Sequence, residues 1–363
     1  MASDPSSSGD PLRLALPELY RIFLPAFFDS PVPRESKATC ANCAMCKPEG
    51  AAPLPGASYF HPDAKCCTFF PKIPNYLVGG LLRDERPDVA EGRRRVRAII
   101  ASRIGVTPAW VAPPRKTRLI YFASRGSSFG RSLTLRCPYF QVEGGLCTIW
   151  RWRESDCSTF YCKYEAGADG QDFWRAFGSY LYEVERRLTE WAMAQVAPDL
   201  AEPLIKDGQL TLEDLEDRAP EPEIYAAYWG SNVGREEEIY IACHDVLAKL
   251  DTAAFDEIAG QVARDRLANL ERSHRNMVAP QLPERLVLSP EVQAVPTETG
   301  MLVSTYCEYE PLSLSPALFE VLRGIRPDET VADVRGRLAR EGTDLPESLL
   351  VTLHQMRVLV PPP

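Results

Sequence analysis

The sequence predicts an α+β fold in three parts: an irregular cysteine-rich domain, a mostly helical middle region and a small C-terminal winged-helix-like domain. Three observations predict this order. Nine of the eleven cysteines lie within residues 40–162, in a stretch with little regular periodicity. Apolar residues then recur every three or four positions, as in amphipathic helices. Strand-like segments followed by capped helices close the chain.

Residues 13–170 form the predicted cysteine-cluster domain, after a Ser, Pro and Gly rich start over residues 1–12 that we expect to be disordered. Residues 14–28 are expected to form a short helix or an extended apolar anchor. The other elements expected in this domain are a helix over residues 93–104 and short strands over residues 117–122 and 132–137. The recurring Pro and Gly suggest that metal ligation stabilises this domain.

The helical middle region is expected over residues 171–280, with helices at 172–196, 235–250 and 252–275. The tail over residues 283–363 is expected to begin with strands near 286–288 and 301–306. Ser315 before Pro316 predicts a helix start, and Thr330 with Asp333 predicts a capping box. A third short helix near residue 347 completes the pattern of a winged-helix-like domain.

The N-terminus and the length of the apolar stretches bear on where the protein is located. The N-terminus lacks the basic start and apolar run of a secretory signal, and no stretch reaches about 18 consecutive apolar residues, so we expect a cytoplasmic protein with no membrane contact. Cytosolic thiols stay reduced, so dense cysteines there indicate metal binding or catalysis rather than disulfides.

Three cysteines at two-residue intervals, Cys40, Cys43 and Cys46, can point toward one centre from a tight loop. Such a run, with a remote cysteine before a proline, is typical of a [4Fe–4S] cluster, and Cys137 precedes Pro138. The remaining candidate ligands are Cys66, Cys67, Cys147, Cys157 and Cys162. Nine thiols suffice for two four-cysteine sites with one left over, or for one cluster, one smaller site and some structural thiols. The metal is expected to be iron in an iron-sulfur cluster, with zinc as the alternative.

Residues 93–163 carry 14 Lys and Arg against 3 Asp and Glu, although the whole chain has a net charge of -9. Cations near a tetrathiolate site offset its negative charge and favour the thiolate. Arg136, Arg151 and Arg153 are therefore candidate donors to the centre, or plain surface residues. The less favoured interpretation is contact with an acidic partner such as nucleic acid.

The order of these motifs resembles the YkgJ-type cysteine-cluster family of zinc- or iron-chelating proteins over residues 40–163. The resemblance rests on the cysteine run, the adjacent pair, Cys-Pro-Tyr-Phe, Gly-Leu-Cys-Thr-Ile-Trp and Arg-Glu-Ser-Asp-Cys. It implies these ligands: Cys40, Cys43, Cys67, Cys137, Cys147, Cys157 and Cys162. About twenty residues separate Cys46 from the pair here, so either Cys46 or Cys66 takes the remaining place.

The tail resembles PqqD-type winged-helix modules through its Leu318, Leu322 and Gly324 pattern. That resemblance implies a peptide strand added to the edge of a small sheet. We therefore expect an iron-sulfur protein that acts in redox or modification chemistry on a peptide or protein. The alternative is a structural-zinc adaptor that contacts an acidic partner or nucleic acid through residues 93–163.

Overall fold

A computed structural model describes residues 9–50, 59–200, 210–298 and 300–363. Helices and small antiparallel sheets occur together, which confirms the α+β class. Within these ranges, every helix is too short or too polar to span a membrane. Of the segment expected to be disordered, residues 1–8 lie outside the described ranges, whereas Asp10–Pro11 forms strand β1 and pairs with β2.

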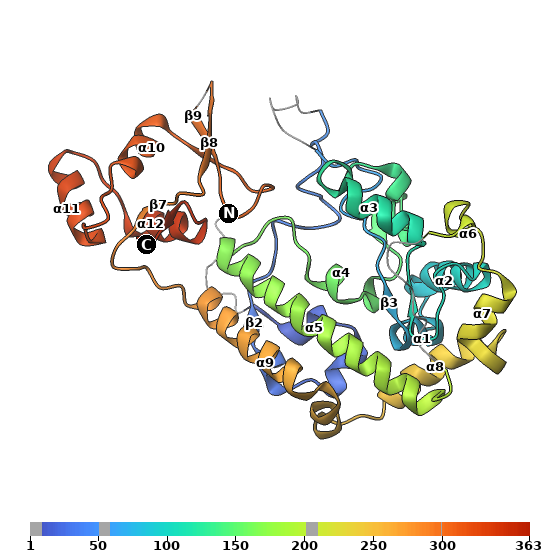
Figure 1. Ribbon diagram of the computed structural model, residues 1–363. Helices are drawn as coiled ribbons and strands as arrows, with labels where there is room; N and C mark the ends of the chain where they lie inside the picture. Colours follow the sequence, from blue (N-terminus) through green and yellow to red (C-terminus); the bar gives the residue numbers. More distant parts are fainter. Residues whose placement is uncertain (1–8, 51–58, 201–209, 299) are drawn as a thin grey trace.

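The larger body, up to the end of α9, contains the helices α1 to α9 (Figure 1). The α-helices are α1 (Asn75–Arg83), α2 (Ala90–Ser102), α3 (Arg115–Ser128), α4 (Ser155–Thr159), α5 (Gly167–Val196), α6 (Leu212–Leu215), α7 (Pro222–Trp229), α8 (Glu236–Leu247) and α9 (Thr252–Val278). The 3-10 helices are η1 (Leu12–Ala15), η2 (Glu18–Ile22), η3 (Ala26–Asp29), η4 (Pro87–Val89), η5 (Leu133–Leu135), η6 (Trp150–Trp152) and η7 (Gly230–Asn232). The strands are β1, β2 (Pro31–Val32), β3 (Ile73–Pro74), β4 (Trp110–Val111), β5 (Phe140–Gln141) and β6 (Leu146–Cys147).

The long helices α5 and α9 lie side by side and form the spine of the larger body (Figure 1). The periodic residues expected on one face of α5 are buried, among them Phe173, Phe177 and Tyr180. Against them packs Phe28 of the 3-10 helix η3, whose ring lies 5.4 Å from that of Tyr180. The apolar anchor predicted for residues 14–28 is therefore confirmed. It consists of 3-10 turns, and Ile22 within it is exposed.

Two of the expected strands are wrong. Residues 117–122 belong to helix α3, and residues 132–137 contain the 3-10 helix η5. A run of six apolar and β-branched residues fits either a strand or one side of a helix, so periodicity over so short a window does not distinguish them. Pro114 is the N-cap residue of α3 and directly precedes the first helical residue.

The C-terminal domain has its own hydrophobic cluster, which runs from Leu286 to Leu359. It contains β7 (Val287–Leu288), β8 (Gln293–Thr297), β9 (Gly300–Ser304), β10 (Leu312–Leu314), α10 (Pro316–Arg323), α11 (Val331–Arg340), α12 (Glu347–Gln355) and β11 (Leu359–Val360). Strand β9 lies between β8 and β10, and β7 pairs with β11. The expected strands and three helices are thus confirmed, as are the Ser315 cap and the Thr330 capping box.

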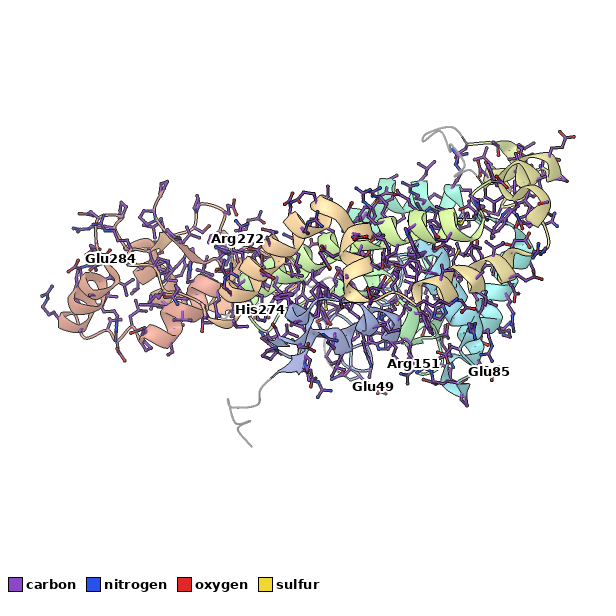
Figure 2. The ribbon with its side chains drawn as sticks, turned by 90° about the horizontal axis from the view of Figure 1, so that it is seen from below. Glu49, Glu85, Arg151, Arg272, His274 and Glu284 are labelled. Atoms are coloured by element: carbon purple, nitrogen blue, oxygen red, sulfur yellow. The ribbon has the colours of Figure 1, made fainter. Side chains whose placement is uncertain are left out.

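The domain extends beyond the end of α9 (Figure 2), where His274 faces the larger body and Glu284 lies on the domain. The His274 ring packs edge-on against Phe27, with centroids 5.5 Å apart. Its Nε2 lies 2.9 Å from the carbonyl oxygen of Pro31. The last turns of α9 therefore pack against the N-terminal segment, directly before the chain continues into the C-terminal domain.

Candidate metal centre

The nine predicted ligands lie on four segments of the larger body. The first segment, residues 40–46, is a loop in which the Cys46 amide donates to the Cys43 carbonyl oxygen at 3.0 Å. The backbone of Cys46 also pairs with that of Phe60 in an isolated parallel β-bridge. The Phe60 amide donates to the Met45 carbonyl oxygen at 2.8 Å. This arrangement ties the loop to the start of the second segment.

The second segment, residues 61–67, is a tight turn that presents the adjacent pair Cys66 and Cys67. Lys65 occupies the left-handed region, with φ of 50°, and its side chain enters the protein. The Lys65 ammonium donates to the carbonyl oxygens of Cys40 at 2.5 Å and of Gly145 at 2.9 Å. Lys65 therefore joins three of the four segments.

The third segment contains Cys137 and Cys147. The amide of Cys137 donates to the Cys67 carbonyl oxygen at 2.8 Å, and Phe140 pairs with Cys147 across the β5–β6 hairpin. Gly144 and Gly145 form the turn of this hairpin with φ of 81° and 63°, values that glycine adopts readily. The hairpin thus brings Cys147 back beside the residues that follow Cys137.

The fourth segment begins with helix α4, which carries Cys157. Glu154 caps this helix: its carboxylate accepts hydrogen bonds from the Asp156 amide at 2.6 Å and the Cys157 amide at 2.8 Å. Arg153 donates to the Cys157 carbonyl oxygen at 2.9 Å, and its guanidinium lies 3.3 Å from the centre of the Trp150 ring. Cys162 follows the helix.

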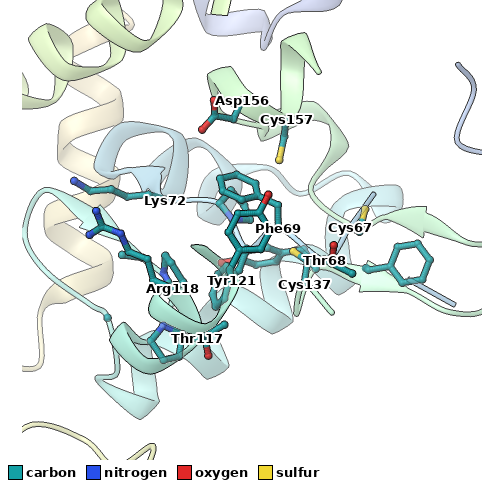
Figure 3. Close-up of a pocket in the computed structure, with 18 of the residues that line it drawn as sticks. Cys67, Thr68, Phe69, Lys72, Thr117, Arg118, Tyr121, Cys137, Asp156 and Cys157 are labelled. Carbon is teal, nitrogen blue, oxygen red and sulfur yellow. The ribbon is translucent and has the colours of Figure 1, made fainter. Parts of the chain in front are cut away.

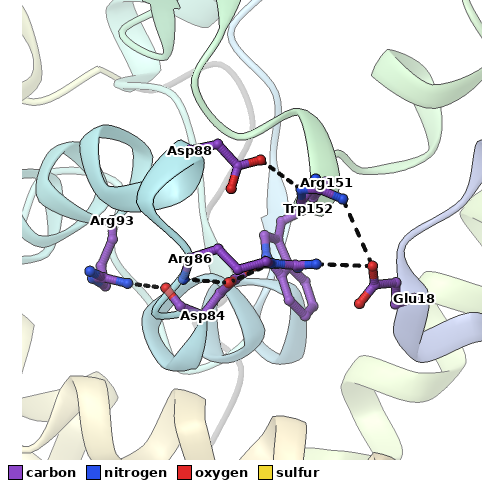
Figure 4. Close-up of polar contacts among 7 residues, drawn as sticks. All are labelled: Glu18, Asp84, Arg86, Asp88, Arg93, Arg151 and Trp152. Carbon is purple, nitrogen blue, oxygen red and sulfur yellow. Dashed lines mark hydrogen bonds and ion pairs between the residues drawn. The ribbon is translucent and has the colours of Figure 1, made fainter.

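A network of charged side chains holds the stretch between Cys147 and Cys157 in place (Figure 4). Trp152 donates from Nε1 to Asp84 at 2.9 Å, and Asp84 also accepts from Arg86 at 2.5 Å. Arg151 pairs with Asp88 at 2.9 Å. These contacts attach η6 to the end of α1 and so fix the position of α4.

Eight of the nine thiols line a single cavity of about 960 Å³: Cys40, Cys43, Cys66, Cys67, Cys137, Cys147, Cys157 and Cys162. Figure 3 shows Cys67, Cys137 and Cys157 around one part of it. Cys46 is the predicted ligand that does not lie on this wall. All eleven cysteines are free thiols in the structure.

The pKa values of several of these thiols are raised by burial. Burial raises the pKa of the Cys40, Cys137, Cys147 and Cys157 thiols, and raises that of Cys162 to about 12. Neighbouring thiols raise the pKa further, as Cys66 does for Cys40, while Arg153 and Lys65 oppose the effect. Thiolates in this cavity therefore need additional positive charge nearby, which a bound metal supplies.

Among the described residues, no three Cys, His, Asp or Glu side chains converge closely enough to form a metal site as they stand. The donor chemistry nevertheless fits an iron-sulfur cluster or zinc: soft sulfur donors share one cavity and two cations adjoin them. Binding would require the thiols to turn toward a common centre.

The three arginines considered as donors differ. Arg153 lies at the thiols, and its charge lowers the pKa of Cys40, Cys66 and Cys147. Arg151 pairs with Asp88 away from them, and Arg136 donates to the Asp63 carbonyl oxygen at 3.5 Å in an exposed position.

Three residues at the site were missed by sequence reasoning: Lys65, Glu154 and Cys307. Cys307 belongs to the C-terminal domain, and its Sγ lies 3.5 Å from the carbonyl oxygen of Cys162. Nothing in its sequence surroundings indicates this contact. Lys65 directly precedes the cysteine pair, and that position was the available signal for its role.

Comparison of the chain with protein-family models, with curated proteins and with solved structures gave no match.

Proposed function

We propose that this chain is a metalloprotein whose cysteines hold an iron-sulfur cluster, with [4Fe–4S] as the expected type. One observation carries the proposal: thiols from four segments, up to about 120 residues apart in the chain, line the same cavity. A buried group of thiols is costly to ionise without a compensating cation, and metal coordination is the usual means of stabilising one. The resemblance of residues 40–163 to the YkgJ-type family supports the same assignment.

The spacing of the cysteines, rather than the type of donor, favours iron-sulfur over zinc. The described wall of the cavity contains cysteines but no histidine, and all-cysteine ligation is common to both metals. The run from Cys40 to Cys46 and the Cys137-Pro138 pair are the features that favour a cubane cluster.

Anaerobic purification with metal analysis tests this proposal directly. We expect brown protein with broad visible absorbance, stoichiometric iron and acid-labile sulfide, and bleaching on reduction. Colourless protein that retains zinc would contradict it and support the structural-zinc alternative. In that case the chain would be an adaptor that contacts its partner through residues 93–163.

The adaptor alternative is weakened by how the basic residues are used. Arg95 pairs with Glu91, Arg97 with Glu237, and Lys116 with Asp217. Cations already paired with carboxylates contribute little to a surface that attracts phosphates. This observation favours charge compensation and internal pairing over nucleic-acid binding.

For the reaction, we propose redox or modification chemistry on a peptide or protein, in the cytoplasm. The C-terminal domain would hold the substrate as a winged-helix-like, PqqD-type module. Strand β8 forms an edge of its three-stranded sheet, and Val295 on that strand is exposed. The loop after β9 reaches the cysteines through Cys307.

This second part has its own test. Small peptides encoded beside the gene would be co-expressed with the protein and examined by mass spectrometry. We expect a mass change that depends on Cys137 and Cys157, and lower amide hydrogen exchange along β8 when the peptide is present. Peptides that neither bind nor change in mass would contradict the proposed reaction and leave the metal assignment standing.

A further inference from the structure

Helix α5 contains two buried glutamates, Glu183 and Glu185, each 4% exposed. The first has cationic partners: its carboxylate pairs with Arg186 at 2.7 Å and with Arg187 at 3.0 Å. Burial alone would raise the pKa of Glu183, but hydrogen bonds from the two arginines outweigh burial and lower it. Glu183 is therefore an ionised carboxylate whose charge is compensated, as buried charges usually are.

Glu185 lies two residues further on, and its partners are neutral. Its Oε2 lies 2.7 Å from the Ser155 hydroxyl oxygen, and its Oε1 lies 3.4 Å from the Tyr20 hydroxyl oxygen. The hydroxyl groups of Tyr20 and Tyr76 are 2.7 Å apart. All three hydroxyl-bearing residues are at most 1% exposed. In the described part of the chain, Glu185 thus forms hydrogen bonds with neutral groups and no ion pair with a cation.

The charged groups that face Glu185 are acidic. Glu154 lies on the other side of Ser155, whose hydroxyl oxygen is 3.4 Å from Glu154 Oε2. Burial, followed by the charges of Glu154 and Asp156, raises the pKa of Glu185 well above its usual value. Two buried carboxyls linked by one hydroxyl group are not both ionised unless a cation compensates them. The surroundings of Glu185 therefore favour a retained proton, in contrast to those of Glu183.

We propose that Glu185 is held as a neutral carboxylic acid that positions helix α4 by donating a hydrogen bond to Ser155. Ser155 is the first residue of α4. Its hydroxyl then donates to Glu154, whose carboxylate accepts from the amide of Cys157 at 2.8 Å. The Tyr20 hydroxyl donates to the other oxygen of Glu185. With this proton in place, every oxygen of the network has a hydrogen-bonding partner.

The role of this acid rests on the proposed metal centre. Thiols must lose their protons to bind metal, and a further negative charge nearby would oppose that loss. A neutral acid fixes the start of α4 through hydrogen bonds without adding such a charge. Glu185 is thus a positioning residue, which acts on Cys157 through Ser155 and Glu154.

Infrared difference spectroscopy on the full chain at pH 7 tests the charge state of Glu185. The difference between the unsubstituted protein and Glu185→Gln should contain the carbonyl stretch of a protonated carboxylic acid. Glu183→Gln is the matched control, because Glu183 is equally buried on the same helix but paired with two arginines. Its difference spectrum should contain the bands of an ionised carboxylate instead. Carboxylate bands in the Glu185→Gln difference would overturn the proposal.

Chelator competition on protein purified anaerobically tests the positioning role. Glu185→Gln keeps a neutral hydrogen-bonding group of similar size, so metal retention should not change. Glu185→Leu removes the hydrogen bond to Ser155 and should weaken retention by roughly tenfold, as the loss of an outer-sphere partner does. Circular dichroism checks that each variant is folded.

A Glu185→Gln protein that failed to fold or lost its metal would contradict the proposal, since the amide is the closest neutral substitute for the acid. Equal metal retention by Glu185→Leu and the unsubstituted protein would contradict the positioning role. Iron and zinc are measured on every sample. Metal-loaded protein with an ionised Glu185 would contradict this inference alone. Protein that never holds metal but shows the acid band would contradict the metal centre and leave the protonated acid standing.

Discussion

The backbone amide of Cys137 donates a hydrogen bond of 2.8 Å to the carbonyl oxygen of Cys67, although seventy residues separate them. This bond joins the adjacent cysteine pair to the Cys-Pro motif. It places Cys67 and Cys137 on the same wall of the cavity. In the proposed metal centre, this hydrogen bond would reduce the ordering that metal binding must otherwise impose.

Cys46, Cys66 and Cys67 are alternative candidates for the remaining ligand positions, and where they lie leads to the first prediction. Cys66 and Cys67 line the cavity and Cys46 does not, so Cys46→Ser should retain the metal while Cys67→Ser should lose most of it. Metal content per chain measures the difference. Cys243→Ser is the control for loss of a buried thiol, because Cys243 is buried on α8 away from the cavity.

A Cys46→Ser protein that lost its metal as fully as Cys67→Ser would contradict this assignment. It would indicate that the loop over residues 40–46 closes onto the cavity when metal binds.

Arg153 provides the second prediction. Its guanidinium donates to the Cys157 carbonyl oxygen and its charge opposes the raised pKa of nearby thiols. Arg153→Gln should therefore weaken metal retention by roughly tenfold, a usual effect of losing an outer-sphere partner. Competition with a chelator measures it. Arg151→Gln serves as the control, since Arg151 pairs with Asp88 and Glu18 instead. If Arg153→Gln and Arg151→Gln lost metal equally, the result would contradict a specific role of Arg153. It would show that both arginines affect metal retention only by stabilising the local fold.

The elements predicted correctly are those with local signals. Ser315 caps α10 by accepting from the Leu318 amide, and Thr330 with Asp333 caps α11, because these hydrogen bonds connect residues three apart. Residues 117–122 were predicted wrongly because Leu119, Ile120 and Phe122 suggested a strand, whereas they are exposed on helix α3. Exposed apolar residues are common and carry no periodic signal.

The candidate site was predictable in part, because the spacing of its cysteines is also a local sequence signal. Cysteine spacing predicted nine candidate ligands, and eight of them line the same cavity. The contacts that hold these segments together were not predictable, because Lys65 donates to the carbonyl oxygens of Cys40 and Gly145, which lie 25 and 80 residues away. The approach of Cys307 depends on how the C-terminal domain packs, and that packing involves apolar contacts without a sequence motif.

Asp84 leads to a prediction about pH (Figure 4). Burial alone would raise the pKa of this carboxyl, but hydrogen bonds from Arg86 and Trp152 outweigh burial and lower it to about 2. A carboxyl with a lowered pKa stabilises the fold above its unfolded pKa, near 4, and loses that contribution as the pH falls toward 2. Asp84→Asn should therefore lower the free energy of unfolding at pH 7 by about 2 kcal/mol.

Urea denaturation at pH 7 and at pH 3 measures this effect. The difference between Asp84→Asn and the unsubstituted protein should shrink at the lower pH. Asp88→Asn is the control, because Asp88 is an exposed partner of Arg151 and should cost less than about 1 kcal/mol. A difference that stays constant between the two pH values would contradict the role given to the Asp84 charge.

The last prediction concerns the contact between the C-terminal domain and the thiol-bearing segments. Glu310 follows the loop that carries Cys307, and it accepts hydrogen bonds from Lys37 at 3.1 Å and from the Tyr164 amide at 3.4 Å. Tyr306 donates to the same carboxylate. Glu310→Ala should loosen this contact by about 1 kcal/mol, or roughly a fivefold increase in local opening.

Amide hydrogen exchange over residues 160–165 and 304–310 measures that opening. Exchange should rise in both segments together, because they separate as a unit, and stay unchanged along α5. Glu291→Ala is the matched control, since Glu291 is exposed on the same domain. A rise confined to residues 304–310 would mean that Glu310 orders its own loop only. The contact with the cysteine site would then rest on apolar packing, such as that of Tyr309 against Phe60, whose ring centres lie 5.8 Å apart.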